Sequence, residues 1–190
     1  MNELLVNFFG IRELFPVLLF VTAAASLAFS VYLLKVNQEN VEKMEKISRW
    51  KVPGIILGAF VLAWCVPHTM PILPDSLHKL LVPFMVAVVI ASWCVLDHLF
   101  ARALGGYIIL TAHLFLRDSF GMEEISNPFF AVICFLYGTF GIFLCGLPYR
   151  LRDIVRLELK PKFRWIFPAF FGILFLAFII AGICYLRVQS

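Results

Sequence analysis

The sequence predicts an all-α, polytopic membrane protein: residues 1–190 form one bundle of six transmembrane helices, arranged as three hairpins with both termini on the outer side. Three observations carry this prediction. Hydrophobic residues make up 62% of the chain and charged residues only 15%, and a soluble domain of this size could not bury so much apolar surface. The apolar residues form six runs of about membrane-spanning length. The basic residues collect in connections that share one side.

The six expected spans follow one another with short connections. They are residues 14–34, 53–73, 80–96, 99–116, 128–147 and 165–186. Pro53 is a good first residue for the second helix, and Pro67 and Pro71 should kink or end it. The uncharged run that begins at Ala103 is short for ~30 Å of hydrocarbon. The fourth span is therefore expected to begin at residue 99, with the charge of Arg102 reaching back to the surface.

Two polar segments precede the second span. Residues 1–13 are apolar but interrupted by charges, which is typical of a short helix at the membrane interface. In the segment 35–51, three glutamates each precede a basic residue by four positions, the favourable order for helical ion pairs. No glycine or proline occurs between Val17 and Lys51. We therefore expect the first helix to continue out of the membrane as a stalk, as far as about Arg49.

The distribution of Lys and Arg predicts the orientation. The connections after the first, third and fifth spans hold twelve of the sixteen basic residues, and the other side holds four. Loops rich in Lys and Arg remain on the cytoplasmic side. We expect an integral protein of the cell (inner) membrane, with these three connections in the cytoplasm.

The connection between the fifth and sixth spans is the most basic part of the chain. Leu151, Ile154 and Val155 can share one face of a helix that Pro161 ends. Basic residues flank that face: Arg150, Arg152, Arg156, Lys160, Lys162 and Arg164. The pattern predicts an amphipathic helix on the anionic inner leaflet, although a helix that binds a partner protein would have the same pattern. Anionic lipid accounts for this charge better than nucleic acid, so no nucleic-acid partner is expected.

Small residues are expected to hold the bundle together, because close packing drives helix association in lipid. Gly54 and Gly58 form a GxxxG pattern on the second span, and Gly138 and Gly141 lie on the fifth. Phenylalanine occurs 21 times and is frequent in the last two spans. We expect these rings to form an aromatic outer surface that contacts lipid or partner helices.

The spans contain little that suggests chemistry. Their centres lack Asp, Glu, Lys and Arg, which proton pumps and ion pathways need in the membrane. The chain contains no HExxH, P-loop or GxSxG motif, and its five cysteines form no CxxC pair. The sequence therefore favours a protein that is not an enzyme, and it predicts no catalytic residue, no metal ligand and no cofactor.

His68 and His113 are the candidate cofactor ligands if a cofactor does bind. His68 lies five residues before the outer end of its span and His113 three residues before the outer end of its own, so their depths should match within a few Å. Two helical histidines at one depth suit bis-histidine haem b, or a quinone near the outer face. The alternative is that each is an interfacial side chain satisfied by water or by the backbone carbonyls that Pro67 frees.

Three functions remain open. The favoured one is a non-catalytic subunit or assembly component of a larger membrane complex that acts through its surface, with other membrane subunits as partners. The second is a small permease or substrate-binding membrane component for an uncharged or lipophilic substrate. Six spans with the Ala24-x-x-x-Ala28 pattern are superficially similar to the substrate-binding components of vitamin importers. The third is a redox subunit that holds haem b or quinone at His68 and His113.

Overall fold

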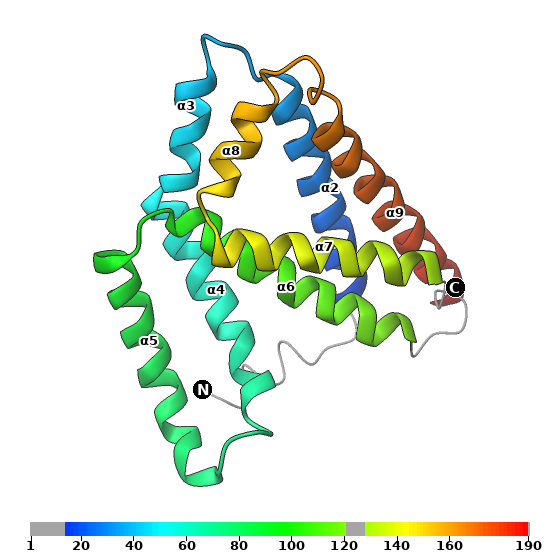
Figure 1. Ribbon diagram of the computed structural model, residues 1–190. Helices are drawn as coiled ribbons and strands as arrows, with labels where there is room; N and C mark the ends of the chain where they lie inside the picture. Colours follow the sequence, from blue (N-terminus) through cyan, green and yellow to red (C-terminus); the bar gives the residue numbers. More distant parts are fainter. Residues whose placement is uncertain (1–13, 121–127, 190) are drawn as a thin grey trace.

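Six long helices and two short ones make up the fold in the computed structural model, which describes residues 14–120 and 128–189 (Figure 1). The long helices are α2 (Leu14–Leu34), α4 (Lys51–Thr69), α5 (His78–Val95), α6 (Leu99–Phe120), α7 (Pro128–Gly146) and α9 (Ile166–Gln189). The short helices are α3 (Val41–Lys46) and α8 (Arg150–Leu157). The described residues contain no strand. The interfacial helix expected in residues 1–13 lies outside them.

The prediction of six spans in an all-helical chain is confirmed. Each long helix is apolar enough and long enough to cross a membrane, as an integral, multi-pass membrane protein requires. Most boundaries lie within two or three residues of the expected ones. The largest differences are four residues: α6 continues to Phe120 and not to residue 116, and α4 ends at Thr69 and not at residue 73. Pro67 lies in the last turn of α4, and Pro71 comes two residues after its end. Neither proline has a backbone N–H group to donate to the helix, so the helix stops here.

The helices do not pack as three sequential hairpins. The most extensive contacts join α6 to α7, and α2, the first span, to α9, the last. Helix α4 packs on α6, and α5 packs mainly on α4. Figure 1 shows α6 and α7 running side by side across the other helices. The positive-inside pattern predicts which loops share a side, but side-chain shape decides which helices touch.

The prediction of a helical stalk after the first span is wrong. Helix α2 ends at Leu34, and Val36 turns into the core with only 4% of its surface exposed. The chain then reverses into α3 and a 3-10 helix, Ile47–Arg49. The Tyr32 hydroxyl donates a hydrogen bond to the Met44 carbonyl oxygen (2.9 Å), which holds α3 beside the end of α2. Helical ion pairs contribute only a few tenths of a kcal/mol each, less than these buried contacts.

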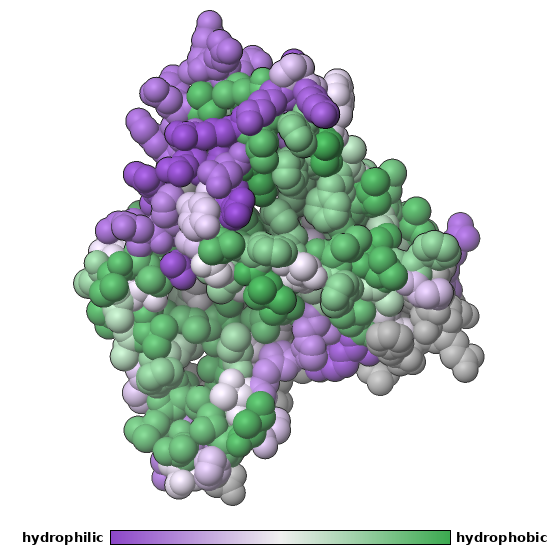
Figure 2. All heavy atoms as spheres, in the orientation of Figure 1, coloured by the Kyte–Doolittle hydropathy of each residue, from purple (hydrophilic) through white to green (hydrophobic). Residues whose placement is uncertain are grey.

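Helix α8 forms where the amphipathic pattern predicts it. Its apolar residues Leu151, Ile154 and Val155 are all buried. They belong to the protein core, so this face packs on the bundle and not on a lipid leaflet as expected. Helices α3 and α8 also contact each other and form what we call the α3–α8 layer. Figure 2 shows hydrophilic side chains gathered over this layer and an apolar surface over α5.

Glycines allow the backbones of α6 and α7 to touch. A Cβ atom added to Gly105 would lie 2.7 Å from both the Cys145 nitrogen and the Gly141 oxygen. A Cβ atom on Gly141 would lie 2.7 Å from Ile108 Cγ2 and 2.9 Å from the Gly105 oxygen. Real Cβ atoms do not approach so closely, so only glycine fits this crossing. Such contact is the main attraction available to helices in lipid.

The other glycines singled out by their spacing differ in how closely they are packed. Gly54 of α4 lies against the start of α6, where an added Cβ atom would lie 2.7 Å from the Phe100 nitrogen. An added Cβ atom on Gly138 would lie 3.1 Å from Ala112 Cβ. Gly58 has ordinary space around it, since its nearest contact would be 3.8 Å away.

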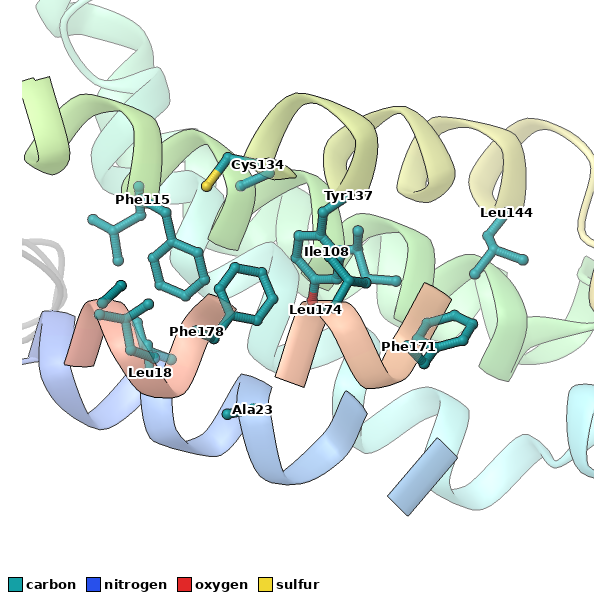
Figure 3. Packing of buried hydrophobic residues seen from close by; sticks show 14 of the residues in the cluster. Leu18, Ala23, Ile108, Phe115, Cys134, Tyr137, Leu144, Phe171, Leu174 and Phe178 are labelled. Carbon is teal, nitrogen blue, oxygen red and sulfur yellow. The ribbon is translucent and has the colours of Figure 1, made fainter. Parts of the chain in front are cut away.

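The phenylalanines of α7 and α9 divide between the core and the outside. Phe171 and Phe178 are buried, whereas Phe129 and Phe135 are exposed. The Phe178 ring lies 5.3 Å, between centroids, from both Phe115 and Tyr137 (Figure 3). Phenylalanine therefore occurs on the outer surface, as expected, and also fills the centre of the bundle.

Candidate functional site

An aromatic cavity of about 360 Å³ lies between four long helices and the α3–α8 layer. Its walls come from α2, α6, α7 and α9, and α3, the following 3-10 helix and α8 contribute one end. Seven of its eighteen lining residues are aromatic: Phe29, Tyr32, Phe100, Tyr107, Tyr137, Phe140 and Phe171. Its volume falls in the range of small-molecule sites, about 300–1,000 Å³. We refer to it as the aromatic cavity.

Small residues of α2 create the space for this cavity. Ala25, Ser26 and Ala28 line it where larger side chains would fill it. The Ser26 hydroxyl donates to the Thr22 carbonyl oxygen of its own helix (2.8 Å). The α2 wall therefore offers mostly methyl and methylene groups, which suits an apolar ligand.

Tyrosine hydroxyls are held within the same region. The Tyr107 hydroxyl lies 3.3 Å from Thr22 Oγ1 and links α6 to α2. The Tyr32 hydroxyl is bonded to α3, as described above. The lack of Asp, Glu, Lys and Arg at the centres of the spans gives no indication of these hydroxyl groups. Tyrosines in the middle of a span, such as Tyr107 and Tyr137, were the signal that could have revealed them.

One end of the aromatic cavity is charged. Arg152 and Glu45 line it there. The Nε atom of Arg152 is buried and has no hydrogen-bond partner in the described part of the chain. The Nη2 atom of the same side chain lies 3.9 Å from a carboxylate oxygen of the adjacent Asp153. Arg156 bonds the Glu45 carboxylate through both oxygens, at 2.5 and 2.9 Å, and these bonds lower the pKa of Glu45. Glu45 therefore stays ionised.

The six basic residues predicted to face a partner or lipid divide by environment. Arg152 lines the aromatic cavity and Arg156 is paired with Glu45. Arg150 is exposed and lies over the Tyr149 ring, 5.6 Å from its centroid. The remaining three are exposed beyond α8: Lys160, Lys162 and Arg164. The basic loop is thus not one uniform surface.

Glu158 is a buried acid that the sequence analysis did not single out. It is 2% exposed, and neither carboxyl oxygen has a hydrogen-bond partner among the described residues. Burial raises its pKa to about 7, against an opposing effect of Arg164. Its spacing was the missed signal, because it lies seven residues after Leu151 and so continues the buried face of α8.

The structure brings the two candidate haem ligands together. The rings of His68 and His113 lie edge to face, with centroids 5.8 Å apart. However, a porphyrin bound by both would have to lie between α4 and α6, which already touch. An added Cβ atom on Gly106 of α6 would come within 3.0 Å of Val61 of α4. The residues present do not fit haem without separation of these helices.

No other cluster in the described part of the chain has the composition of a metal site, since no group of three or more His, Cys, Asp or Glu side chains is placed to hold an ion. Comparison of the chain with protein families, with curated proteins and with solved structures finds no match.

Among the features described above, the aromatic cavity provides the strongest basis for a function.

Proposed function

We propose that this protein binds a lipophilic molecule in the aromatic cavity, as a small permease or substrate-binding membrane component. The cavity is the observation that supports this function. Its side walls are aromatic and aliphatic, so they offer a large contact area to an apolar ligand and few partners to a polar one. Four of the helices that line it are long and apolar enough to cross a membrane, which suits a ligand that partitions into the bilayer.

Two alanines of α2 give a matched test. Ala28 lines the aromatic cavity, whereas Ala24 is also exposed on the same helix but does not line it. Purified wild-type protein should retain a lipophilic compound detectable by mass spectrometry, and it should bind the apolar dye N-phenyl-1-naphthylamine. Ala28→Trp should abolish both, because the indole fills the cavity. Ala24→Trp should preserve both. Equal binding by the two variants, or none by the wild type, would contradict the proposal.

A second candidate function is favoured by helix α5: a non-catalytic subunit or assembly component of a larger membrane complex. None of the residues of α5 is buried, and Leu80, Phe84 and Ile90 are each at least 59% exposed. An apolar helix that contacts few others is a natural surface for the helices of another subunit.

Co-purification tests this second candidate. After extraction in a mild detergent, the protein should elute with other membrane proteins in fixed stoichiometry. Phe84→Ala together with Ile90→Ala should release them, while exposed residues of α7, such as Phe135, should tolerate the same change. A monomer without partners under these conditions would favour the ligand-binding function alone.

The proposal places the protein in the cell (inner) membrane with the α3–α8 layer in the cytoplasm. The excess of basic residues on that side supports this orientation. Single cysteines at Lys43 and Lys79 test it in a cysteine-free background, since α4 separates these two exposed positions (Figure 1). An impermeant thiol reagent added outside should label position 79 and not 43.

A further inference from the structure

A second hollow adjoins the charged end of the aromatic cavity. It is a polar cleft of about 330 Å³ between α3 and α8, lined by Glu42, Glu45, Lys46, Arg49, Arg152 and Arg156. Glu45 and Arg152 line both hollows. An apolar space and a polar, charged space therefore meet at these two side chains.

The cleft carries an excess of positive charge. Arg156 and Glu45 neutralise each other through their bidentate ion pair. Among the residues that line the cleft, this leaves Lys46, Arg49 and Arg152 against Glu42, an excess of two positive charges. Asp153, which lies 3.9 Å from Arg152 Nη2, does not line the cleft and offsets part of this excess. A site with this balance attracts an anion of about two negative charges, which is the charge of a phosphate monoester near neutral pH.

Arg152 is placed to hold such an anion. Its buried Nε donor has no partner in the described residues, and leaving a buried donor unsatisfied is costly. The guanidinium fork matches phosphate oxygens in two parallel hydrogen bonds. The side chain is about one-third exposed (33%), so it remains accessible from the cleft.

We propose that the two hollows form one site for an amphiphile: an apolar chain in the aromatic cavity and a phosphate monoester head in the polar cleft, held by Arg152. This inference rests on the proposed function and specifies its ligand class. The two hollows together support an amphiphile better than either hollow alone. A purely apolar ligand would not use the cation at the end of the aromatic cavity, and a free anion would not use the apolar space beside the cleft.

The binding experiment compares three probes on the protein in neutral maltoside detergent. Radiolabelled hexadecyl phosphate is displaced by unlabelled hexadecyl phosphate, by hexadecanol or by inorganic phosphate. Hexadecyl phosphate should compete roughly tenfold or more better than hexadecanol, the effect of one or two hydrogen bonds to a charged group. Inorganic phosphate should compete poorly, which distinguishes an amphiphile from a free anion.

Variants of α8 identify the residue responsible. Arg152→Gln should bring hexadecyl phosphate to the affinity of hexadecanol, with hexadecanol itself unchanged. Arg150→Gln is the matched control, because it removes one charge from the same helix but Arg150 lines neither hollow; it should retain the preference. Arg49 lines the polar cleft but not the aromatic cavity, so Arg49→Gln should reduce the preference for hexadecyl phosphate. This variant tests the proposal if Arg152→Gln fails to fold.

The possible failures are distinguishable. Equal competition by hexadecyl phosphate and hexadecanol in the wild type would overturn the phosphate head while leaving the lipophilic site intact. If Arg150→Gln and Arg152→Gln lose the preference for hexadecyl phosphate equally, the phosphate head is also overturned, because the preference then depends on the overall charge of α8. Inorganic phosphate as effective as hexadecyl phosphate would overturn the amphiphile. Binding of none of the probes would remove the proposed function as well.

Discussion

Helices α5 and α6 are both apolar spans, yet their surroundings are opposite. Half of the α6 span is buried within the protein, and none of the α5 span is. Helix α6 contacts α7 and α4 extensively, while α5 lies at the edge with α4 as its main neighbour (Figure 1). The difference follows from residue size, because α6 carries Gly105 and Gly106 at its contacts and α5 has no glycine.

This contrast shows that apolarity and packing are separate properties in a membrane protein. Lipid is as apolar as a leucine side chain, so an apolar helix gains little by leaving lipid for protein. A helix becomes central when its small residues allow close approach or its side chains interlock. The aromatic cavity lies in the region where that packing leaves a gap, beside α6 and not beside α5.

Replacement of buried and exposed phenylalanines is expected to show the largest difference. Phe178 is fully buried, with ring contacts to several neighbours, whereas Phe84 of α5 is 67% exposed. Phe178→Ala should lower the free energy of unfolding by roughly 3 kcal/mol, and Phe84→Ala by less than about 0.5 kcal/mol. Thermal unfolding in detergent measures both. Similar losses would mean that α5 is packed more tightly than the structure shows.

Glu158 should make the buried face of α8 sensitive to pH. Because its pKa is raised to about 7, the folded protein keeps a proton that the unfolded chain releases near pH 4.5. The free energy of unfolding should therefore fall as pH rises between these values and level off above about 7. Glu158→Gln should flatten this dependence and stabilise the protein at pH 8 by roughly 2–3 kcal/mol.

Denaturation curves at several pH values check the prediction for Glu158. Glu39→Gln, at an exposed position before α3, is the control and should leave the pH dependence unchanged. A pH dependence that persists in Glu158→Gln would assign it to other groups.

Glycine substitutions should separate contact positions from open ones. Gly141→Ala places a Cβ atom 2.9 Å from the Gly105 oxygen, so we expect a loss of about 1–3 kcal/mol as α6 and α7 move apart. Gly172 of α9 has nothing within 4 Å of an added Cβ atom. Gly172→Ala should be neutral or stabilising by up to about 1 kcal/mol, because alanine favours helix. Unfolding midpoints that shift equally would refute the close crossing.

The contact between α4 and α5 should show the smallest effect. The Lys51 ammonium group lies over the Trp93 ring, 5.9 Å from its centroid, and so connects these two helices. Exposed cation–π contacts contribute roughly 0.5 kcal/mol. A double-mutant cycle of Lys51→Gln and Trp93→Leu should give a coupling of that size. No coupling would mean that this contact does not hold α5 in place.

The sequence by itself determined the class of this protein. Apolar runs of spanning length predict helices in the bilayer whatever the tertiary contacts, because a backbone in lipid must satisfy its own hydrogen bonds. The amphipathic pattern at Leu151, Ile154 and Val155 likewise predicted α8. These are local properties, set by residues within one helix.

Only the tertiary structure decided which helices touch and where space remains. The stalk prediction failed because local ion pairs are weaker than the burial of Val36 and the bond between Tyr32 and Met44. Seven helical elements line the aromatic cavity. No local pattern in the sequence predicts that these elements come together. Arg152 resembled its neighbours in the basic loop, and it differs from them only because the folded chain buries its Nε atom between an apolar space and a charged one.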